Sequence, residues 1–152
     1  MNLADVLLHP NEYDGNSVAS PWSWLLPASA SLLHVTVFGN FVLLDAMGRG
    51  WLLDSWAGRL HGMCASYEEY KHSAASDEEF FRSWFLVDLF ESLKTAGLVR
   101  QAVQVFGPIV SPGLGGSLSP KNFSIAPLAA YIATSAAEAH LLQKGAHRRA
   151  GA

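Results

Sequence analysis

The chain has 152 residues, enough for one domain, and 50% of them are hydrophobic while only 15% are charged. This composition excludes a disordered chain, and the net charge of −3 argues against general nucleic-acid binding, because phosphate contacts need clustered Lys and Arg. The single cysteine excludes an intrachain disulfide and a thiolate-rich zinc site.

The N-terminal region and the longest uncharged stretch bear on the cellular compartment. The first residues lack the positive region of a secretory signal, which together with the lone Cys64 fits a reducing compartment. Residues 22–44 carry no formal charge, but Pro27 and the Gly39-Asn40 pair interrupt them, and their later part alternates as a strand does. We therefore expect a cytoplasmic protein that makes no membrane contact.

The first half of the chain predicts a sheet preceded by a short helix. The helix is expected over residues 3–8, and the aromatic segment 20–27 is expected to pack beneath the sheet. Runs of β-branched and aromatic residues, interrupted every few positions by glycine, then predict an antiparallel meander. Its strands are expected at residues 34–38, 41–45, 50–55 and 59–64.

The periodicity becomes helical after the meander. Ser66 and Glu69 have the spacing of a capping box and predict a helix to about Ala74. Ser76 or Asp77 then begins a longer helix that ends at residue 97. We expect a core beneath the sheet that includes Trp51 and the widest apolar face of this helix, which is made of Phe81, Phe85, Leu86, Leu89, Phe90 and Leu93.

The last third of the chain predicts a strand, a long loop, a second strand and a helix, at residues 103–106, 107–120, 123–125 and 127–143. A loop of this length in a small domain is usually functional or disordered. The order of elements predicts an α+β fold, with a mostly antiparallel sheet packed against three or four helices. We expect one domain over residues 1–143 and a basic, frayed tail over residues 144–152.

No pattern of catalytic or metal-binding residues stands out. The six histidines form no His-x-x-x-His or His-x-His pair, and Cys64 has no basic neighbour in sequence that would lower the pKa of its thiol. The glycine-rich segment 114–117 lacks the Gly-Lys-Ser/Thr ending of a phosphate loop, and we expect its glycines to allow a tight turn instead. The expectation is a protein without catalytic residues, metal or cofactor.

Acidic residues are concentrated between Ser66 and Glu91, and two interpretations stay open. Carboxylates in the first turn of a helix stabilise it through the helix dipole and are common as solvated caps. The same residues could form an anionic surface that docks a cationic partner. On the second interpretation the partner contacts are Glu68, Glu69, Asp77, Glu78 and Glu79.

Several motifs occur in an order that resembles a known family. The segment 20–27 is similar to its "WRWLLP" opening, and residues 38–54 are similar to its "FGDLFL…DGxVWxLD" hairpin. Leu114-Gly115-Gly116 and Asn122 match its "LGG-x-Y-x-x-x-N" motif, although Ser117-Leu118 departs from it. The family is the type VI secretion immunity domain, the C-terminal domain of Tdi-type proteins that neutralise DNase effectors, and the resemblance covers residues 20–143.

The resemblance implies an immunity protein that binds and neutralises a cognate antibacterial toxin in the cytoplasm. The expected partner is a nuclease effector, with no direct contact to nucleic acid. Leu114, Gly115 and Gly116 join the acidic residues as candidate partner contacts. The alternative is a small-molecule-binding or regulatory module that uses the 107–120 loop, and an enzyme is the third possibility.

Overall fold

The computed structural model describes residues 1–150, with side chains described as far as Ala146. The strands are β1 (Ser31–Val35), β2 (Phe41–Leu44), β3 (Gly50–Asp54), β4 (Arg59–Cys64), β5 (Gln104–Pro108) and β6 (Phe123–Pro127). The α-helices are α1 (Gly15–Ala19), α2 (Tyr67–Ser76), α3 (Glu78–Trp84), α4 (Val87–Thr95) and α5 (Leu128–Ala150). Short 3-10 turns occur at η1 (Leu3–Asp5), η2 (Pro10–Glu12), η3 (Ser20–Trp22), η4 (Pro112–Leu114) and η5 (Pro120–Asn122). The α+β class predicted from the sequence is confirmed.

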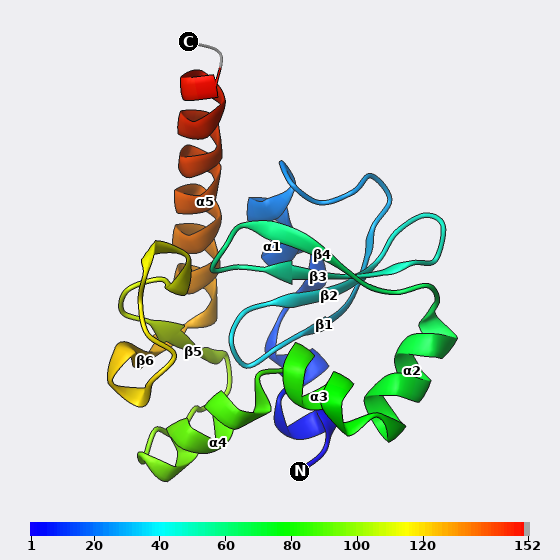
Figure 1. Ribbon diagram of the computed structural model, residues 1–152, viewed down its shortest axis with the longest axis vertical. Coiled ribbons are helices and arrows are strands. Elements are labelled where there is room, and N and C mark those ends of the chain that lie inside the picture. The colour runs from blue at the N-terminus through cyan, green and yellow to red at the C-terminus, as the bar shows by residue number, and fades with distance from the viewer. Residues whose placement is uncertain (151–152) are drawn as a thin grey trace.

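The strands form two antiparallel sheets instead of one. The first is a meander in the order β1-β2-β3-β4, and the second pairs β5 with β6 beside the lower part of α5 (Figure 1). A backbone hydrogen bond from Phe106 N to Val37 O, 2.9 Å long, joins β5 to the turn between β1 and β2. The two sheets therefore meet at that turn and share one core.

The first strand lies three residues earlier than predicted. Residues 36–38, expected to finish the strand, belong to the turn into β2 because the Thr36 hydroxyl oxygen accepts hydrogen bonds from Phe38 N (3.3 Å) and Asn40 N (3.2 Å). A threonine side chain that bonds the backbone in this way offers it an alternative to the strand ladder. The other three strands of the meander lie where they were predicted, within one residue.

The helix predicted over residues 3–8 is wrong beyond its first turn. Only η1 is helical, and the chain then runs extended along the β1 edge, where Leu8 N donates to Val35 O (2.8 Å) and Val37 N donates to Val6 O (2.9 Å). Val6 and Leu8 are buried in the core in this extended form. Pairing with the sheet therefore overrides the local helical pattern.

The long helix predicted to end at residue 97 is also wrong, because it is two helices. The chain breaks at Leu86, which has a left-handed backbone with φ 54° and ψ 44° between α3 and α4. The break changes the direction of the chain. As a result Phe85 and Val87, which lie on either side of it, are both buried. Of the predicted core face, Phe85, Leu89, Phe90 and Leu93 are buried, whereas Phe81 and Leu86 are partly exposed, as is Trp51.

The C-terminal third is more regular than predicted. β5 takes up the first two residues of the expected 107–120 loop, and the rest contains η4 and leads into η5. α5 continues past residue 143 to Ala150, and its distal part projects beyond the rest of the molecule (Figure 1). Residues 151–152 of the expected tail lie outside the described residues.

The aromatic segment before the meander packs against α5. Trp22 is fully buried, and the ring of Trp24 stacks on His140 of α5 with centroids 4.5 Å apart and planes inclined by 10°. At the centre of the core, the Phe38 ring meets Trp56 and Phe106 at centroid distances of 5.9 and 6.0 Å. Aromatic pairs at these separations stabilise the fold by more than their buried area alone would. These pairs therefore help to hold the two sheets and α5 together.

Candidate partner-binding surfaces

The acidic residues predicted for partner binding lie at the two ends of α2. Glu68 and Glu69 are in its first turn, whereas Asp77 follows its last residue and Glu78 and Glu79 begin α3. A helix of this length rises roughly 15 Å. The five carboxylates therefore form two groups and not one patch.

Three of these carboxylates have partners within the fold. The Ser66 hydroxyl oxygen accepts from Glu69 N (3.1 Å) and caps α2 as predicted, but the Glu69 carboxylate accepts from Ala65 N (2.6 Å) and not from the Ser66 N that a capping box requires. Asp77 caps α3 by accepting from Phe80 N at 3.0 Å. Glu68 pairs with the Lys71 ammonium at 2.8 Å. The helix-capping interpretation of the acidic stretch is thus supported for two of the five residues.

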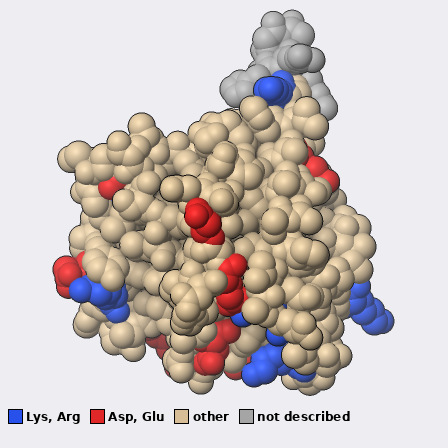
Figure 2. Space-filling model, turned by 180° about the vertical axis from the view of Figure 1, so that it is seen from behind, with Lys and Arg blue, Asp and Glu red and all other residues tan. Residues whose placement is uncertain are grey.

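Ion pairs also reduce the charge of the acidic stretch as a whole. Arg82 of α3 bonds both Asp88 and Glu91 of α4, the latter at 3.0 Å. Seen from behind, the molecule is mostly uncharged, with a broken vertical band of Asp and Glu and with Lys and Arg mainly toward its edges (Figure 2). Glu78 and Glu79 are exposed and form no ion pair within the described part of the chain.

A groove of about 810 Å³, which we call the α2 groove, runs beside α2 and is also bounded by η1, α3 and α4. Tyr67 and Tyr70 line it with ring centroids 6.3 Å apart, and His34 lies 5.9 Å from Tyr70. Burial lowers the pKa of His34, which favours its neutral form. Asp77 and Glu78 line the same groove, so it combines aromatic rings with carboxylates.

Tyr70 is an unusual member of this groove. It is only 2% exposed, and its hydroxyl has no hydrogen-bond partner within the described residues. Burial, with smaller contributions from Cys64 and Tyr67, raises the pKa of this hydroxyl well above its ordinary value, so the group stays protonated. A buried polar group without a partner costs about 1–3 kcal/mol, and a cost of that size calls for an explanation.

The Leu114-Gly115-Gly116 motif lies in a segment that the Asn122 side chain holds in place. The Asn122 amide donates to Val110 O (2.8 Å) and Ser117 O (2.9 Å), and its carbonyl oxygen accepts from Val110 N (2.9 Å). Gly115 has φ +92°, and a Cβ on Gly116 would lie 1.9 Å from Val110 O. Both glycines therefore serve the tight turn, as predicted, and Leu114 is left 62% exposed.

A second concave surface, which we call the α5 cleft, lies between α5, the β3–β4 turn and residues 109–114. Its volume is about 760 Å³, and Trp56 and Tyr131 are among its lining residues. Ile109, Leu114 and Leu142 also line it, and they are 66%, 62% and 55% exposed. The cleft therefore has an apolar rim that is in contact with solvent.

A buried polar chain beneath the α5 cleft joins the meander to α5. The hydroxyls of Tyr131 and Ser55 are 2.8 Å apart, and the Asn40 carbonyl oxygen accepts from Ser55 Oγ (2.8 Å) and Ser55 N (2.9 Å). Burial raises the pKa of Tyr131 to about 12. From the sequence, Asn40 was predicted only as part of a turn. The hydrogen bonds among these three residues could not be predicted, because no local pattern links residues so far apart.

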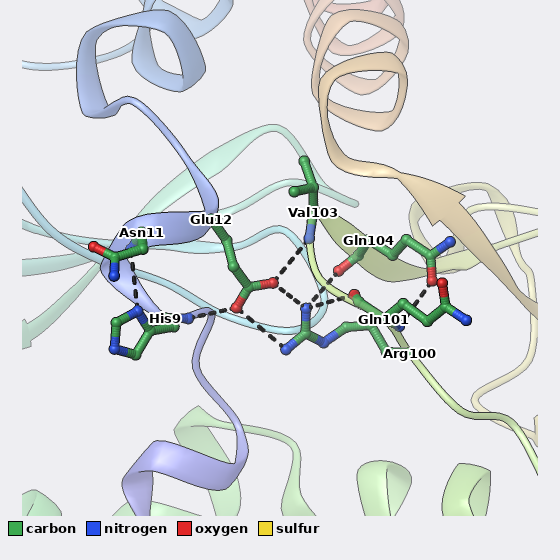
Figure 3. Close-up of polar contacts among 7 residues, drawn as sticks. All are labelled: His9, Asn11, Glu12, Arg100, Gln101, Val103 and Gln104. Carbon is green, nitrogen blue, oxygen red and sulfur yellow. Dashed lines mark hydrogen bonds and ion pairs between the residues drawn. The ribbon is translucent and has the colours of Figure 1, made fainter.

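A buried ion pair fixes the N-terminal segment to the chain before β5. Figure 3 shows Glu12 between His9 and Arg100: its carboxylate accepts from His9 N (2.6 Å), Val103 N (2.9 Å) and Arg100 Nη1 (2.5 Å). Burial alone would raise the pKa of Glu12, but the hydrogen bonds from Arg100, His9 and Val103 outweigh it and hold the pKa below its ordinary value. This pair was also missed, since neither residue belongs to a motif.

Two further observations concern residues 1–150. Among the side chains that the structure describes, which end at Ala146, no three His, Cys, Asp or Glu come together in a group that could hold a metal ion. Among the helices described, none combines the length and the low polarity of a membrane span.

The two surfaces lie on different sides of the molecule. The α2 groove lies with α2 on one side of the meander, whereas the α5 cleft lies on the side of β5, β6 and α5 (Figure 1). The candidate residues Glu68 and Leu114 are therefore not brought together into one site. Both surfaces are open to solvent on a closely packed α+β scaffold.

Part of the chain matches a known protein family. Residues 65–136 match the family "T6SS immunity protein Tdi1, C-terminal", which confirms over that segment the resemblance seen in the sequence. The matched segment runs from the start of α2 into α5, and it contains most of the lining of the α2 groove but less than half of that of the α5 cleft. It leaves out the meander, which the expected resemblance over residues 20–143 had included.

Among solved structures, the fold is similar to one described as "Crystal structure of Atu4351 from Agrobacterium tumefaciens", with a TM-score of 0.55 and 18% sequence identity. The similarity covers 86% of this chain and 65% of that chain, so this chain spans less than two thirds of its length. At this identity the likeness shows a common fold. No curated protein matches the sequence.

Proposed function

We propose that this protein is an immunity protein, which binds a cognate antibacterial toxin and blocks it. The observation that carries the proposal is the match of residues 65–136 to the type VI secretion immunity family. A stoichiometric inhibitor needs a stable scaffold and a complementary surface, and it needs no catalytic group. The buried chain through Tyr131 and the ion pair of Glu12 supply the first requirement.

The toxin we propose is a nuclease effector delivered by type VI secretion and met in the cytoplasm. A nuclease uses a Lys/Arg-lined cleft to hold phosphates, and an acidic inhibitor is the electrostatic complement of such a cleft. The net charge of −3 and the exposed carboxylates at both ends of α2 support this pairing. The toxin contacts are drawn from the candidates Glu68, Glu69, Asp77, Glu78, Glu79, Leu114, Gly115 and Gly116, not all of which need to meet the toxin.

Co-expression with the cognate nuclease effector, sought among the products of the adjacent genes, tests the proposal. Cells that express the toxin alone should lose viability and show degraded DNA. Cells that also express this protein should grow, and the two proteins should copurify. Unchanged killing in the presence of well-expressed, folded protein would contradict an immunity function.

A second function, in which the α5 cleft binds a small molecule, has one observation in its favour. Its volume of about 760 Å³ lies within the range of roughly 300–1,000 Å³ that is usual for ligand pockets. Such pockets enclose most of the ligand, whereas Ile109, Leu114 and Leu142 are each more than half exposed. Thermal-shift screening against a metabolite library should therefore find no stabilising compound, and a reproducible hit would favour this second function.

A further inference from the structure

We propose that the α2 groove receives a short basic segment of the toxin, with Asp77 and Glu78 as its counter-charges and the Tyr70 hydroxyl as its buried hydrogen-bond partner. This inference rests on the proposed immunity function. It selects, from the predicted acidic residues, those that line a concave surface, and it leaves Glu79 outside.

The charges around the groove favour a cationic occupant. Two cationic side chains line it, beside the N-terminal Met1, and carboxylates already hold both: Glu68 pairs with Lys71, and Asp88 and Glu91 pair with Arg82. Asp77 and Glu78 also line the groove, and neither forms an ion pair within the described residues. These two carboxylates remain to meet Lys or Arg side chains of a partner.

Tyr70 is the independent observation that points to an occupant. Its hydroxyl is buried and unpartnered although Tyr70 lines the groove. A phenol oxygen can accept a hydrogen bond from an ammonium, a guanidinium or a backbone N–H. A partner atom that reaches this hydroxyl would satisfy a group that the free protein leaves without a hydrogen bond.

The hydroxyl oxygen has almost no solvent-exposed surface, so a partner reaches it only after a neighbouring side chain moves. Tyr67 and Lys71 line the groove beside it and are both exposed, with the Lys71 ammonium 4.7 Å from the centre of the Tyr67 ring. Changes of side-chain rotamer at an interface are common on binding. A cation of the toxin can take the place of the Lys71 ammonium over that ring, where it is attracted by the face of the aromatic system.

The dimensions of the groove set the length of the segment. Tyr67 and Glu78 lie at opposite ends of α2, a separation of roughly 15 Å at the rise of an α-helix. An extended chain rises about 3.3 Å per residue, so the groove accommodates about four or five residues. One end of the segment meets the aromatic pair, and the other meets the free carboxylates.

The inference is tested by measuring how fast purified variants bind a catalytically inactivated form of the cognate toxin. Tyr70→Phe removes only the hydroxyl, and Glu78→Lys reverses a charge in the groove. Glu79→Lys is the matched control, because it makes the same change in the same helical turn outside the groove. Melting temperatures of all three variants report on folding.

We expect Tyr70→Phe to melt at or above the wild-type temperature yet to bind the toxin about ten-fold more weakly, as loss of one buried hydrogen bond predicts. Glu78→Lys should slow association most strongly at low salt, whereas Glu79→Lys should bind nearly as wild type does. Wild-type kinetics for both groove variants would overturn the groove while leaving immunity in place. Failure of the wild-type protein to bind would overturn both proposals.

Discussion

Asn40, Ser55 and Tyr131 show how single residues join parts of the chain that are distant in sequence. One Asn40 carbonyl oxygen accepts two hydrogen bonds from Ser55, and the Tyr131 hydroxyl extends the chain into α5. Asn40 and Ser55 are each 3% exposed. In such a chain each buried group depends on the next for its hydrogen bond.

Substitution of Asn40 should therefore be more damaging than its polar surface suggests. Asn40→Ala leaves the N–H and the hydroxyl of Ser55 without their acceptor, and we expect a loss of about 2–3 kcal/mol in the free energy of unfolding. Tyr131→Phe removes one end of the chain only and should cost about 1 kcal/mol. Urea unfolding measures the loss for each variant. Equal losses would show that the hydrogen bonds of Ser55 do not depend on the Asn40 carbonyl oxygen.

The Glu12–Arg100 pair makes a prediction about pH. The folded protein holds the pKa of Glu12 below its unfolded value, so the pair stabilises above the unfolded pKa, and this contribution is lost as the pH falls through the folded pKa. At about pH 7, Glu12→Gln should reduce the free energy of unfolding by roughly 2 kcal/mol.

The difference between wild type and Glu12→Gln should shrink in acid, since protonated Glu12 no longer attracts Arg100. Glu138→Gln, on the exposed side of α5, is the control and should change little at any pH. A Glu12→Gln difference that stays constant from neutral pH to about pH 3 would contradict the role given to the carboxylate charge.

At the scale of elements, the break between α3 and α4 decides what reaches the core. Leu86 adopts a left-handed backbone, which costs a non-glycine residue about 1–2 kcal/mol. Burial of Phe85, Val87, Leu89 and Leu93 offsets that cost. In a continuous helix Phe85 and Val87, two positions apart, would point to nearly opposite faces, whereas the break allows both to be buried.

Phe85 is the residue on which this arrangement depends most. It is 1% exposed, and Phe85→Ala should reduce the free energy of unfolding by about 3–5 kcal/mol. Phe80→Ala, in the preceding turn and only partly buried, is the matched control and should cost clearly less. Equal destabilisation of the two variants, measured by chemical denaturation, would mean that the core beneath α3 is misplaced.

The segment held by Asn122 makes a prediction about its two glycines. Gly116→Ala should disrupt the turn because its Cβ would meet the backbone carbonyl of Val110, whereas Gly115→Ala meets open space and bears only the cost of a left-handed backbone, about 1–2 kcal/mol. Thermal melting should place Gly116→Ala well below Gly115→Ala. Equal melting temperatures would indicate that the turn opens readily.

Elements set by local chemistry could be predicted from the sequence, and those set by tertiary contacts could not. The glycine turns of the meander and the helix cap at Ser66 act within a few residues, so β2, β3, β4 and the start of α2 lie where expected. The break at Leu86 has no local signal. The extended path of Val6 to Leu8 depends on the edge of β1, which comes much later in the chain.

The same division applies to the candidate sites. The sequence predicted the acidic stretch correctly as helix starts, because carboxylates after Ser66 and Asp77 follow capping rules. It also separated them into two groups, one at each predicted helix start. It could not show that Tyr70 lines a groove while its hydroxyl is buried without a partner, since that depends on packing among four elements.

For the whole molecule, the separation of the two surfaces limits how a toxin can bind. A protein–protein interface of standard size covers about 800 Å² on each partner. A compact partner of that footprint would engage either the α2 groove or the α5 cleft, which lie on different sides of the meander (Figure 1). Charge complementarity favours the α2 groove for a nuclease, and the exposed apolar rim favours the α5 cleft for an apolar segment.

The central claim is that this protein inhibits by binding a toxin stoichiometrically. Titration of the purified toxin into the protein by calorimetry, with residual nuclease activity followed in parallel, measures this most directly. We predict a saturable complex of one to one and nuclease activity that reaches zero at the same equivalence point. Full nuclease activity in the presence of excess protein, with no heat of binding, would contradict the account.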